Sequence, residues 1–355
     1  MRSSTDQADT PARPGRPRYT RQRNGPLRFL APLLAVLVLL VLITESLALG
    51  SRTLSPEEVW QGFLVYDNSV ASKVVWGLRI HRTILAIVVG ASLAVAGVVM
   101  QALTRNPLAE PGILGVNAGA SLAVVAAIGG LGLTSVNQYL PFAFAGAAAA
   151  AVLVHMMSRR SADSGPARLV LAGVALGASL SSITGTITMY NSKIFDSYRF
   201  WVVGSLENRK LEVLLWVAPF LAVGLVLALA SAHSLNALAL GDEQATALGV
   251  NLAVVRGVAF VALTLLCGAA TAAAGPISFI GLVIPHVVRL LVGADQKHLL
   301  AWSVAAGAGL LLAADVAGRL LIRPTELEAG IVTAFIGAPV LLVLAVTNRT
   351  NRRSA

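Results

Sequence analysis

Charged residues are scarce in this sequence. Only 12% of the 355 residues are Asp, Glu, Lys or Arg, whereas 56% are hydrophobic, and the mean hydropathy is +0.76. So few charges cannot cover the surface of soluble domains of this total length. Uninterrupted apolar runs close to the roughly 20 residues that a helix needs to cross a bilayer recur along the chain. These runs predict an all-α polytopic membrane protein.

Cysteine and paired histidine are also lacking. Cys267 is the single cysteine and lies within an apolar run, which excludes an intrachain disulfide and a cysteine metal cluster. None of the five histidines pairs with another at ligand spacing. We therefore expect no bound metal, and we interpret Cys267 as a small core residue.

The sequence has no motif for catalysis or nucleotide binding. It contains no HExxH, Gly-x-Ser-x-Gly or GxxxxGK[ST] pattern. We therefore expect that the protein is not an enzyme, that it has no ATPase site of its own, and that it binds no cofactor. Its only lysines stand outside any such context, at Lys73, Lys193, Lys210 and Lys297. The net charge of +10 does not predict nucleic-acid binding, because the basic residues are spread over loops and tails without interleaved aromatic residues.

Apolar runs separated by polar or Gly/Pro-rich breaks predict about ten transmembrane helices. They lie near residues 29–49, 80–103, 113–131, 138–157, 168–190, 211–233, 251–273, 277–292, 298–320 and 327–347. Three segments are rich in arginine, which is typical of cytosolic loops and tails. Their arginines are Arg13, Arg16, Arg18, Arg21, Arg23, Arg28, Arg159, Arg160, Arg168, Arg349, Arg352 and Arg353. With an even number of spans, both termini are expected to be cytosolic.

The predicted domain organisation is one transmembrane domain with two tails. Residues 1–28 are expected to form a disordered cytosolic tail, residues 29–347 the transmembrane domain, and residues 348–355 a second cytosolic tail. The first apolar run is as long as a full span and no clear cleavage site follows it, so we expect a membrane helix there and no signal peptide. On the outer side, TLSPEEVW predicts a surface helix with Ser55 as N-cap and Glu58 closing a capping box. Residues 191–212 predict an outer turn or short helix.

Few charges lie deep within the apolar runs, and Asp315 and Arg289 are the main ones. An ion-coupled secondary transporter normally carries buried carboxylates or unwound helices near the midplane. One aspartate gives little support for an ion-coupled transporter, but that class stays as an alternative to a transporter whose energy comes from an ATPase partner. The dependence of uptake on ATP or on an ion gradient would distinguish these two classes.

The run at 168–190 places four small residues on one helix face, at intervals of four. They are Gly173, Gly177, Ser181 and Gly185. Such a face lets another backbone approach closely. Two interpretations remain open: ordinary packing within the membrane, or a face that lines a substrate path at a subunit interface.

Several stretches, in order, resemble the FecCD family of ABC-importer permeases for ferric siderophores, haem and cobalamin. They are RIHR at 79–82, the run containing RNPLAEPGILGVNAGA at 90–120, LAGVALG at 171–177, RFWVVGSL at 199–206, LGDEQATALGVN at 240–251, GPISFIGLVIPHVVRLLVGAD at 275–295, and ADVAGRL with ELEAGIVTAFIGAP between 314 and 339. The resemblance covers residues 30 to 347. It implies ten helices, a second permease subunit (this chain again or a related one), a cytosolic ATPase dimer, an outer binding protein, and the bacterial cytoplasmic membrane as location.

The resemblance also implies roles for individual positions. A coupling segment that seats in the ATPase matches Leu240, Gly241, Asp242, Glu243, Gln244, Ala245, Leu248 and Gly249. Physically, Asp242 suits the cap of a short helix, Glu243 suits its first turn, and Gly249 can end it. The alternative is a linker helix without a partner.

Arginines that dock the binding protein match Arg79, Arg82 and Arg319, and the alternative for these is anchoring at the headgroups. A gate at the cytosolic mouth matches Asn106, Pro107 and Leu108, with a plain turn as the alternative. Among the cargoes of the family, the motifs are more similar to the ferric-siderophore branch than to haem or cobalamin permeases.

Overall fold

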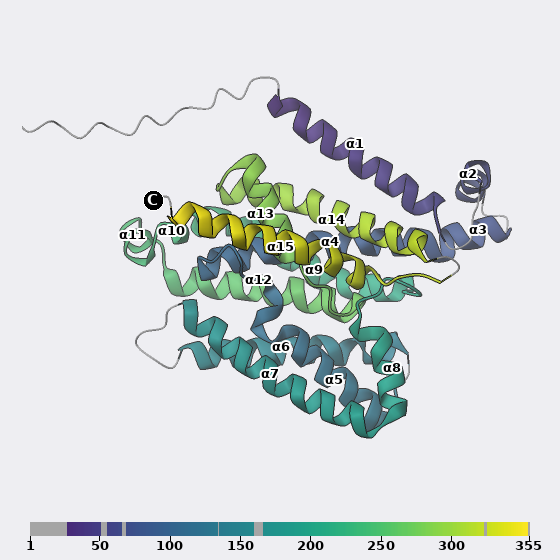
Figure 1. Ribbon diagram of the computed structural model, residues 1–355, viewed down its shortest axis with the longest axis horizontal. Helices are drawn as coiled ribbons and strands as arrows, with labels where there is room; N and C mark the ends of the chain where they lie inside the picture. The colour runs from purple at the N-terminus through teal and green to yellow at the C-terminus, as the bar shows by residue number, and fades with distance from the viewer. Residues whose placement is uncertain are drawn as a thin grey trace, which may run out of the picture.

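The computed structural model describes residues 27–50, 55–65, 69–133, 135–159, 166–322 and 325–353. These ranges form helices and turns, with no strand among them, which confirms the all-α prediction (Figure 1). The long or apolar helices are α1 (Leu27–Ala48), α4 (Ile80–Thr104), α5 (Val116–Leu131), α6 (Val136–Arg159), α7 (Pro166–Tyr190), α9 (Leu211–Ala230), α12 (Leu252–Ala274), α13 (Ile280–Val292), α14 (Gln296–Leu321) and α15 (Ala329–Arg353).

The short elements are α2 (Pro56–Leu64), α3 (Val70–Val74), the π-helix η1 (Val75–Arg79), the 3-10 helix η2 (Pro111–Leu114), α8 (Ser192–Val202), α10 (Ala232–Ala239) and α11 (Asp242–Ala247). Most of them lie at the two ends of the molecule, whereas η2 lies within the bundle. In Figure 1, α2, α3 and α8 lie at one end, which we name the α2 end. Helices α10 and α11 lie at the opposite end together with the end of α15, and we name this the α11 end.

Each predicted span coincides with an apolar helix. Six helices of the described ranges are long and apolar enough to cross a membrane, and four more are apolar but shorter. The capping box at Ser55 is also confirmed, because the Ser55 side chain accepts from the Glu58 amide while the Glu58 carboxylate accepts from the Ser55 amide. Residues 1–26 of the predicted N-terminal tail lie outside the described ranges, and α15 continues through most of the predicted C-terminal tail, to Arg353.

The third and eighth spans begin later than predicted. Gly115 and Phe279 have φ angles of 75° and 72°, in the left-handed region, so the α-helices begin only at Val116 and Ile280. Left-handed backbone is costly for a side chain such as Phe279, and local apolar patterning gives no sign of it. The predicted runs therefore included short segments that precede the α-helices: residues 113–115, at the end of η2, and residues 277–279.

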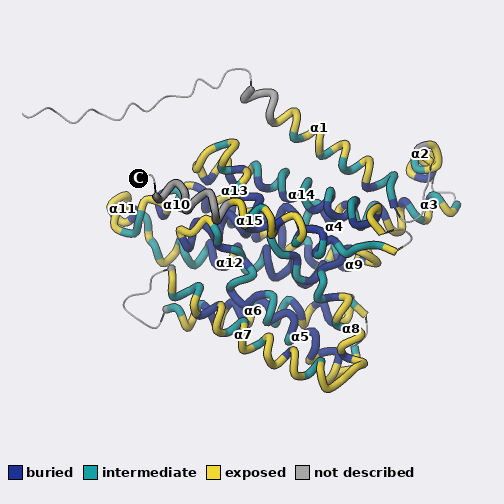
Figure 2. Tube along the Cα trace, in the orientation of Figure 1, coloured by how far each residue is buried: buried dark blue, intermediate teal, exposed yellow. Residues whose placement is uncertain are grey.

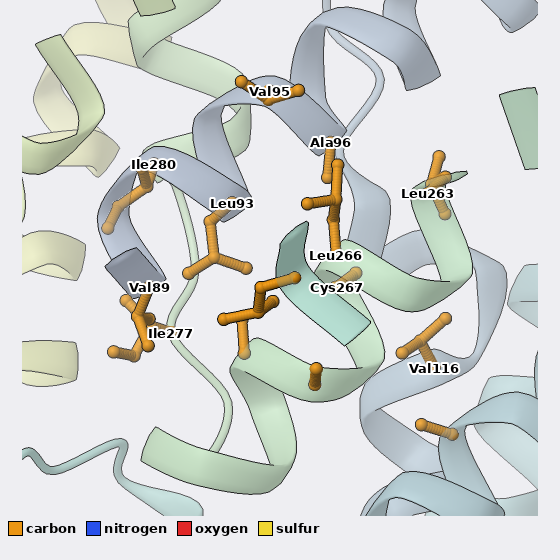
Figure 3. Close-up of a cluster of buried hydrophobic side chains, with 14 of the residues drawn as sticks. Val89, Leu93, Val95, Ala96, Val116, Leu263, Leu266, Cys267, Ile277 and Ile280 are labelled. Atoms are coloured by element: carbon orange, nitrogen blue, oxygen red, sulfur yellow. The ribbon is translucent and has the colours of Figure 1, made fainter. Parts of the chain in front are cut away.

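Helix α4 is the centre of the molecule. It packs against α14, α12 and α13, while α5 pairs with α6 and α12 pairs with α9. Every α4 residue from Gly90 to Thr104 is buried, which Figure 2 shows as a dark segment inside the bundle. Around this segment the core is made of aliphatic side chains from α4, α5, α12 and the start of α13, with Ile277 and Cys267 among them (Figure 3). The prediction that Cys267 is a core residue is confirmed.

Close backbone contacts hold α4 in place. A Cβ added at Gly97 would stand 1.9 Å from the carbonyl oxygen of Gly281, and one added at Gly90 would stand 2.4 Å from that of Gly307. In lipid, helices gain little from burying apolar surface against each other, so such close packing supplies much of the association energy. The glycines of α4 therefore fix the positions of α13 and α14.

Gly97→Ala is expected to reduce the free energy of unfolding by about 1–3 kcal/mol, the usual cost of adding a methyl group to a tightly packed core. Gly257→Ala is the matched control, because no heavy atom lies within 4 Å of the Cβ position at this helical glycine. Thermal unfolding of the purified chain in detergent should show a lower midpoint for the first variant only. Equal midpoints for both variants would contradict the role of the Gly97 contact.

Candidate functional site

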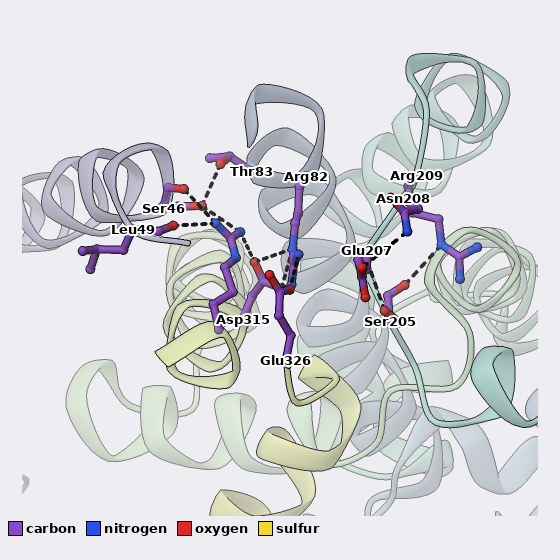
Figure 4. Close-up of polar contacts among 11 residues, drawn as sticks. Ser46, Leu49, Arg82, Thr83, Ser205, Glu207, Asn208, Arg209, Asp315 and Glu326 are labelled. Atoms are coloured by element: carbon purple, nitrogen blue, oxygen red, sulfur yellow. Dashed lines mark hydrogen bonds and ion pairs between the residues drawn. The ribbon is translucent and has the colours of Figure 1, made fainter. Parts of the chain in front are cut away.

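A buried ionic cluster lies at the α2 end, between α4, α14 and the turn before α15. Arg82 donates to the Asp315 carboxylate through Nε at 2.9 Å and Nη2 at 2.8 Å, and to Glu326 through Nη1 at 2.6 Å. Arg319 pairs with the other oxygen of Asp315. Figure 4 shows the side chains of Asp315 and Glu326 directed toward Arg82. Asp315, fully buried, therefore serves as the shared anion of two arginines.

Two arginines of this region also hold the end of α1. The last carbonyl groups of a helix lack partners within the helix and need other donors. Arg79 donates to the carbonyls of Leu47 and Ala48 at 2.7 and 2.8 Å, and Arg319 donates to those of Ser46 and Leu49 at 2.8 and 3.2 Å. Their positive charge also suits the negative end of the α1 dipole.

The structure thus brings Arg79, Arg82 and Arg319 together, but it also gives each of them partners within the chain. Arg79 and Arg319 are 5% and 2% exposed, and the Arg82 side chain is 13% exposed. Sequence reasoning named the three arginines and missed their acceptors. Asp315 stood out as a deep charge, but its pairing with Arg82 joins residues 233 positions apart, which local patterns do not reveal. The other deep charge, Arg289, donates to Gln101 at 3.0 Å.

At the α11 end, the predicted coupling segment contains a short helix. Ala245 is buried and holds α11 against the body, whereas Leu240 and Leu248 are 57% and 65% exposed. The helix ends as predicted: Gly249 has a φ of 80°, and the amides of Gly249 and Val250 bond the carbonyls of Thr246 and Ala245. This is a Schellman motif, which a glycine at this position favours.

The prediction that Asp242 caps α11 is wrong. The N-cap is Gly241, and no side chain caps this end. Asp242 is instead drawn to two arginines: it pairs with Arg105, which follows α4, and with Arg256 on α12 at 2.6 Å. Partial burial acts to raise the pKa of Asp242, but the hydrogen bonds from Arg256 and Arg105 outweigh it and lower the pKa below its usual value.

The 105–115 segment runs from the α11 end into the bundle. Asn106 and Pro107 are exposed and Leu108 is half-buried, whereas Ala109, Pro111 and Leu114 are buried. The Glu110 carboxylate accepts from the amide of Phe279 at 2.7 Å, and the Pro111 ring lies against Gly281. The segment therefore reaches the start of α13, and sequence reasoning gave no role to Glu110 or Arg105.

The small-residue face of α7 divides into two parts. Gly173 packs so closely on the carbonyl of Ile113 that a Cβ would come within 2.3 Å, and Gly177 faces Gly115 at van der Waals distance. Further along, nothing lies within 4 Å of a Cβ at Gly185, and Ser181 is exposed. Close packing is therefore confirmed at Gly173 and Gly177, whereas the face is open at Ser181 and Gly185, where a substrate path at a subunit interface stays a prediction.

The open part of α7 borders a cavity of about 310 Å³. Its lining carries hydroxyl, amide and small apolar groups and no formal charge, from α5, α7, α8 and the turn after α12. The residues are Asn117, Ala118, Ser121, Ser181, Thr184, Gly185, Thr188, Tyr198, Val202 and Pro276. This volume is at the lower end of the range for small-molecule sites. Among the described residues, no three His, Cys, Asp or Glu side chains come together as metal ligands would.

Asp315→Ala is expected to reduce the free energy of unfolding by about 3–5 kcal/mol, because it leaves two buried arginines without their shared counter-charge. Asp196→Ala is the control, since Asp196 forms an exposed pair with Arg199 on α8. Unfolding of both variants in mixed micelles would measure the difference. A loss below about 1 kcal/mol for Asp315→Ala would mean that the cluster is not a support of the fold.

Comparisons with known proteins agree with this architecture. The model of the FecCD transport family matches residues 37–347. The chain is 44% identical over 312 residues to the ferric enterobactin transport system permease protein FepD of Escherichia coli (strain K12), covering 87% of this chain and 93% of that protein. It is 39% identical over 331 residues to the Fe(3+)-citrate import system permease protein YfmD of Bacillus subtilis (strain 168), covering 93% and 98%.

Other matches extend the range of named cargoes and include a solved structure. Permeases named for haemin transport in Yersinia pestis and for vitamin B12 import in Yersinia enterocolitica are 36% and 40% identical, with coverage of 89% and 91% of this chain and 95% and 94% of those proteins. A chain described as a metal-chelate type ABC transporter in an inward-facing conformation superposes with a TM-score of 0.78 at 30% identity, covering 89% of this chain and 98% of that one. With its helices in this order and its sequence matched from the first span to the last, the chain belongs to the FecCD transport family.

Proposed function

We propose that this chain is the permease subunit of an ABC importer and that it carries a ferric siderophore across the bacterial cytoplasmic membrane. The cavity beside α7 is the observation that carries the proposal. It lies where small and hydroxyl-bearing residues leave a helix face open, and its lining mixes hydroxyl and amide groups with apolar ones and carries no formal charge. The names of the most similar relatives, for enterobactin and ferric citrate, favour ferric chelates as cargo.

The chemistry of the lining suits passage more than retention. The hydroxyls of Thr184 and Thr188 donate to carbonyls within α7 at 2.9 Å, so they offer mainly weak acceptors to a passing molecule. Because the lining carries no formal charge, it does not favour a ferric chelate of one net charge over another. Conduction requires binding that is weak enough for release, and the absence of formal charge in the lining favours weak binding.

One chain supplies only part of such a path. Near the α2 end of α7, Met189 and Tyr190 are each 86% exposed, and Phe335 on α15 is 76% exposed. Large apolar side chains at this exposure need lipid or protein cover. We propose that a second permease subunit, either this chain or a related one, faces α7 and completes the path.

The energy for transport is proposed to come from a cytosolic ATPase dimer at the α11 end. The exposed Leu240 and Leu248 flank α11 and offer apolar contacts to such a partner. The end of α15 lies at the same end of the molecule (Figure 1), which supports cytosolic termini. The sequence motif for a gate, Asn106, Pro107 and Leu108, lies on this side as well, and we keep the gate as part of the proposal.

At the α2 end we propose that a binding protein docks on Arg82. Arg82 and Glu326 are the most accessible members of the ionic cluster, with side chains 13% and 15% exposed. A carboxylate of the binding protein can replace Glu326 on Nη1 while Asp315 keeps Nε and Nη2 in place. Arg79 and Arg319 then act as supports for α1, which modifies the expectation that all three arginines dock directly.

Reconstitution with the ATPase and the binding protein in liposomes tests the proposed function. We expect uptake of a ferric siderophore that requires ATP inside the cytosolic compartment. Haem and cobalamin are the second candidates, because relatives named for both are in the same family, and each should be offered in the same assay. Uptake driven by an ion gradient without ATP would refute the ABC mechanism, and uptake of haem or cobalamin alone would refute the cargo.

Arg82→Gln is expected to weaken binding of the binding protein by about tenfold or more, the size of a lost charge-assisted hydrogen bond. Glu326→Gln should strengthen it, because the competing carboxylate charge is removed. Glu207→Gln, an exposed glutamate in the turn after α8, is the control and should have no effect. Titration of the reconstituted permease with the binding protein measures all three. Unchanged affinity of a folded Arg82→Gln permease would exclude docking at this arginine.

A further inference from the structure

We propose that Arg105 is a positioning residue that joins α11 to the 105–115 segment, so that a displacement of α11 moves this segment and, through it, the start of α13 and the wall of the cavity. The inference rests on the proposed function in one respect: it takes α11 as the element that the ATPase moves. Beyond that function, it assigns a role to Arg105 and names the contacts that connect α11 with the cavity wall.

The first link is the guanidinium of Arg105. Arg105 is the C-cap of α4 and has left-handed backbone, with φ 48° and ψ 33°. This conformation is uncommon for a residue with a side chain and persists when surrounding contacts fix it. Here Nε donates to the carbonyl of Leu238 at 3.0 Å and Nη2 pairs with Asp242. One side chain therefore bonds both the end of α10 and the first residue of α11.

Asp242 makes this link a junction of three helices. Its second carboxylate oxygen pairs with Arg256 on α12 at 2.6 Å. The side chains are partly exposed, 32% for Arg105 and 42% for Asp242, and exposed ion pairs contribute little to stability. Arg105 therefore contributes more to the position of α11 relative to the end of α4 than to the stability of the fold.

The second link is the stiffness of the segment itself. The amide of Asn106 bonds the carbonyl of Gln101 on α4, and the Asn106 side chain accepts from the amide of Leu108 at 3.0 Å. The amide of Ala109 bonds the Asn106 carbonyl, and η2 follows with its own backbone bonds. A turn with this many internal hydrogen bonds moves as one piece.

The third link lies at the far end of the segment. Glu110 accepts from the Phe279 amide at 2.7 Å, directly before α13, and the Pro111 ring contacts Gly281. The carbonyl of Ile113 lies so close to Gly173 that the two backbones cannot move past each other without separating. Helix α7 continues from Gly173 to Ser181 and Gly185, which line the cavity. Contacts between rigid pieces thus run from α11 to the cavity wall.

The experiment measures cargo transported per ATP hydrolysed by the complete complex in liposomes. Arg105→Gln is expected to leave hydrolysis in place and to lower this ratio by about fivefold or more, the low end of the range for allosteric coupling. Arg256→Gln is the matched control, since it removes the other partner of Asp242 and leaves the link to the segment intact. Its ratio should stay near that of the unmodified complex.

Asp242→Ala provides a second test in case Arg105→Gln fails to assemble, because it removes the partner carboxylate of Arg105 without placing a like charge beside Arg256. It should lower the ratio about as far as Arg105→Gln, and the Arg256→Gln control accounts for the other ion pair that it removes. A normal ratio in an assembled Asp242→Ala complex would overturn the proposal. So would a proportional loss of hydrolysis and uptake in Arg105→Gln, because that result means that Arg105 only seats the ATPase.

The outcomes also separate this inference from the proposed function. If the unmodified complex shows no ATP-dependent uptake, the proposed function fails. If the unmodified complex couples normally and Arg105→Gln keeps the same ratio, only the role of Arg105 fails.

Discussion

Backbone hydrogen bonding in a medium without water is the constraint on which the rest of this structure depends. Helices satisfy it internally, but every interruption needs a partner elsewhere in the protein. Three breaks among the described residues show such partners: the Glu110 carboxylate for the Phe279 amide, the Ala274 carbonyl for the Ser205 amide, and the Gly204 carbonyl for the Gly330 amide. The breaks are therefore cross-links between segments that are distant in sequence. They hold the non-helical backbone beside α7 and α13, where the cavity and the segment that follows α4 meet.

The two groups of arginine and carboxylate side chains at opposite ends of the molecule illustrate how burial changes the role of a charge. At the α2 end, Asp315 is fully buried and its loss would leave charges in a medium that cannot solvate them. At the α11 end, Asp242 is accessible to water and its pairs add little to stability. The first arrangement suits a fixed anchor for α1, α4 and α14. The second suits the positioning of α11, because it sets where this short helix stands relative to the end of α4.

The sequence predicted the helices well and their contacts poorly, for physical reasons. Hydropathy reports the length of apolar segments, so each predicted span coincides with a helix in the structure. The capping box at Ser55 could be predicted because its two residues are close in sequence. The left-handed residue Phe279 interrupts an apolar run without a change in polarity, so the eighth span was predicted to begin too early. The cap role of Asp242 failed because Arg105, on a distant segment, competes for the same carboxylate. Of the candidate site, the family motifs indicated where to look, but the acceptors of Arg82 and the cavity of α5, α7 and α8 depend on tertiary packing that no local pattern encodes.

The capping of α1 has a consequence for the order in which the protein is made. Membrane proteins are synthesised from the N-terminus, so α1 enters the bilayer before α14. Arg79 becomes available soon after, 32 residues beyond Leu47, whereas Arg319 lies 273 residues beyond Ser46. Until α14 is made, Arg319 cannot donate to the carbonyls at the end of α1, and Arg79 is the one of the two arginines available to them. The last third of the chain therefore completes the attachment of α1, and a product truncated before α14 would lack the Arg319 hydrogen bonds to this helix.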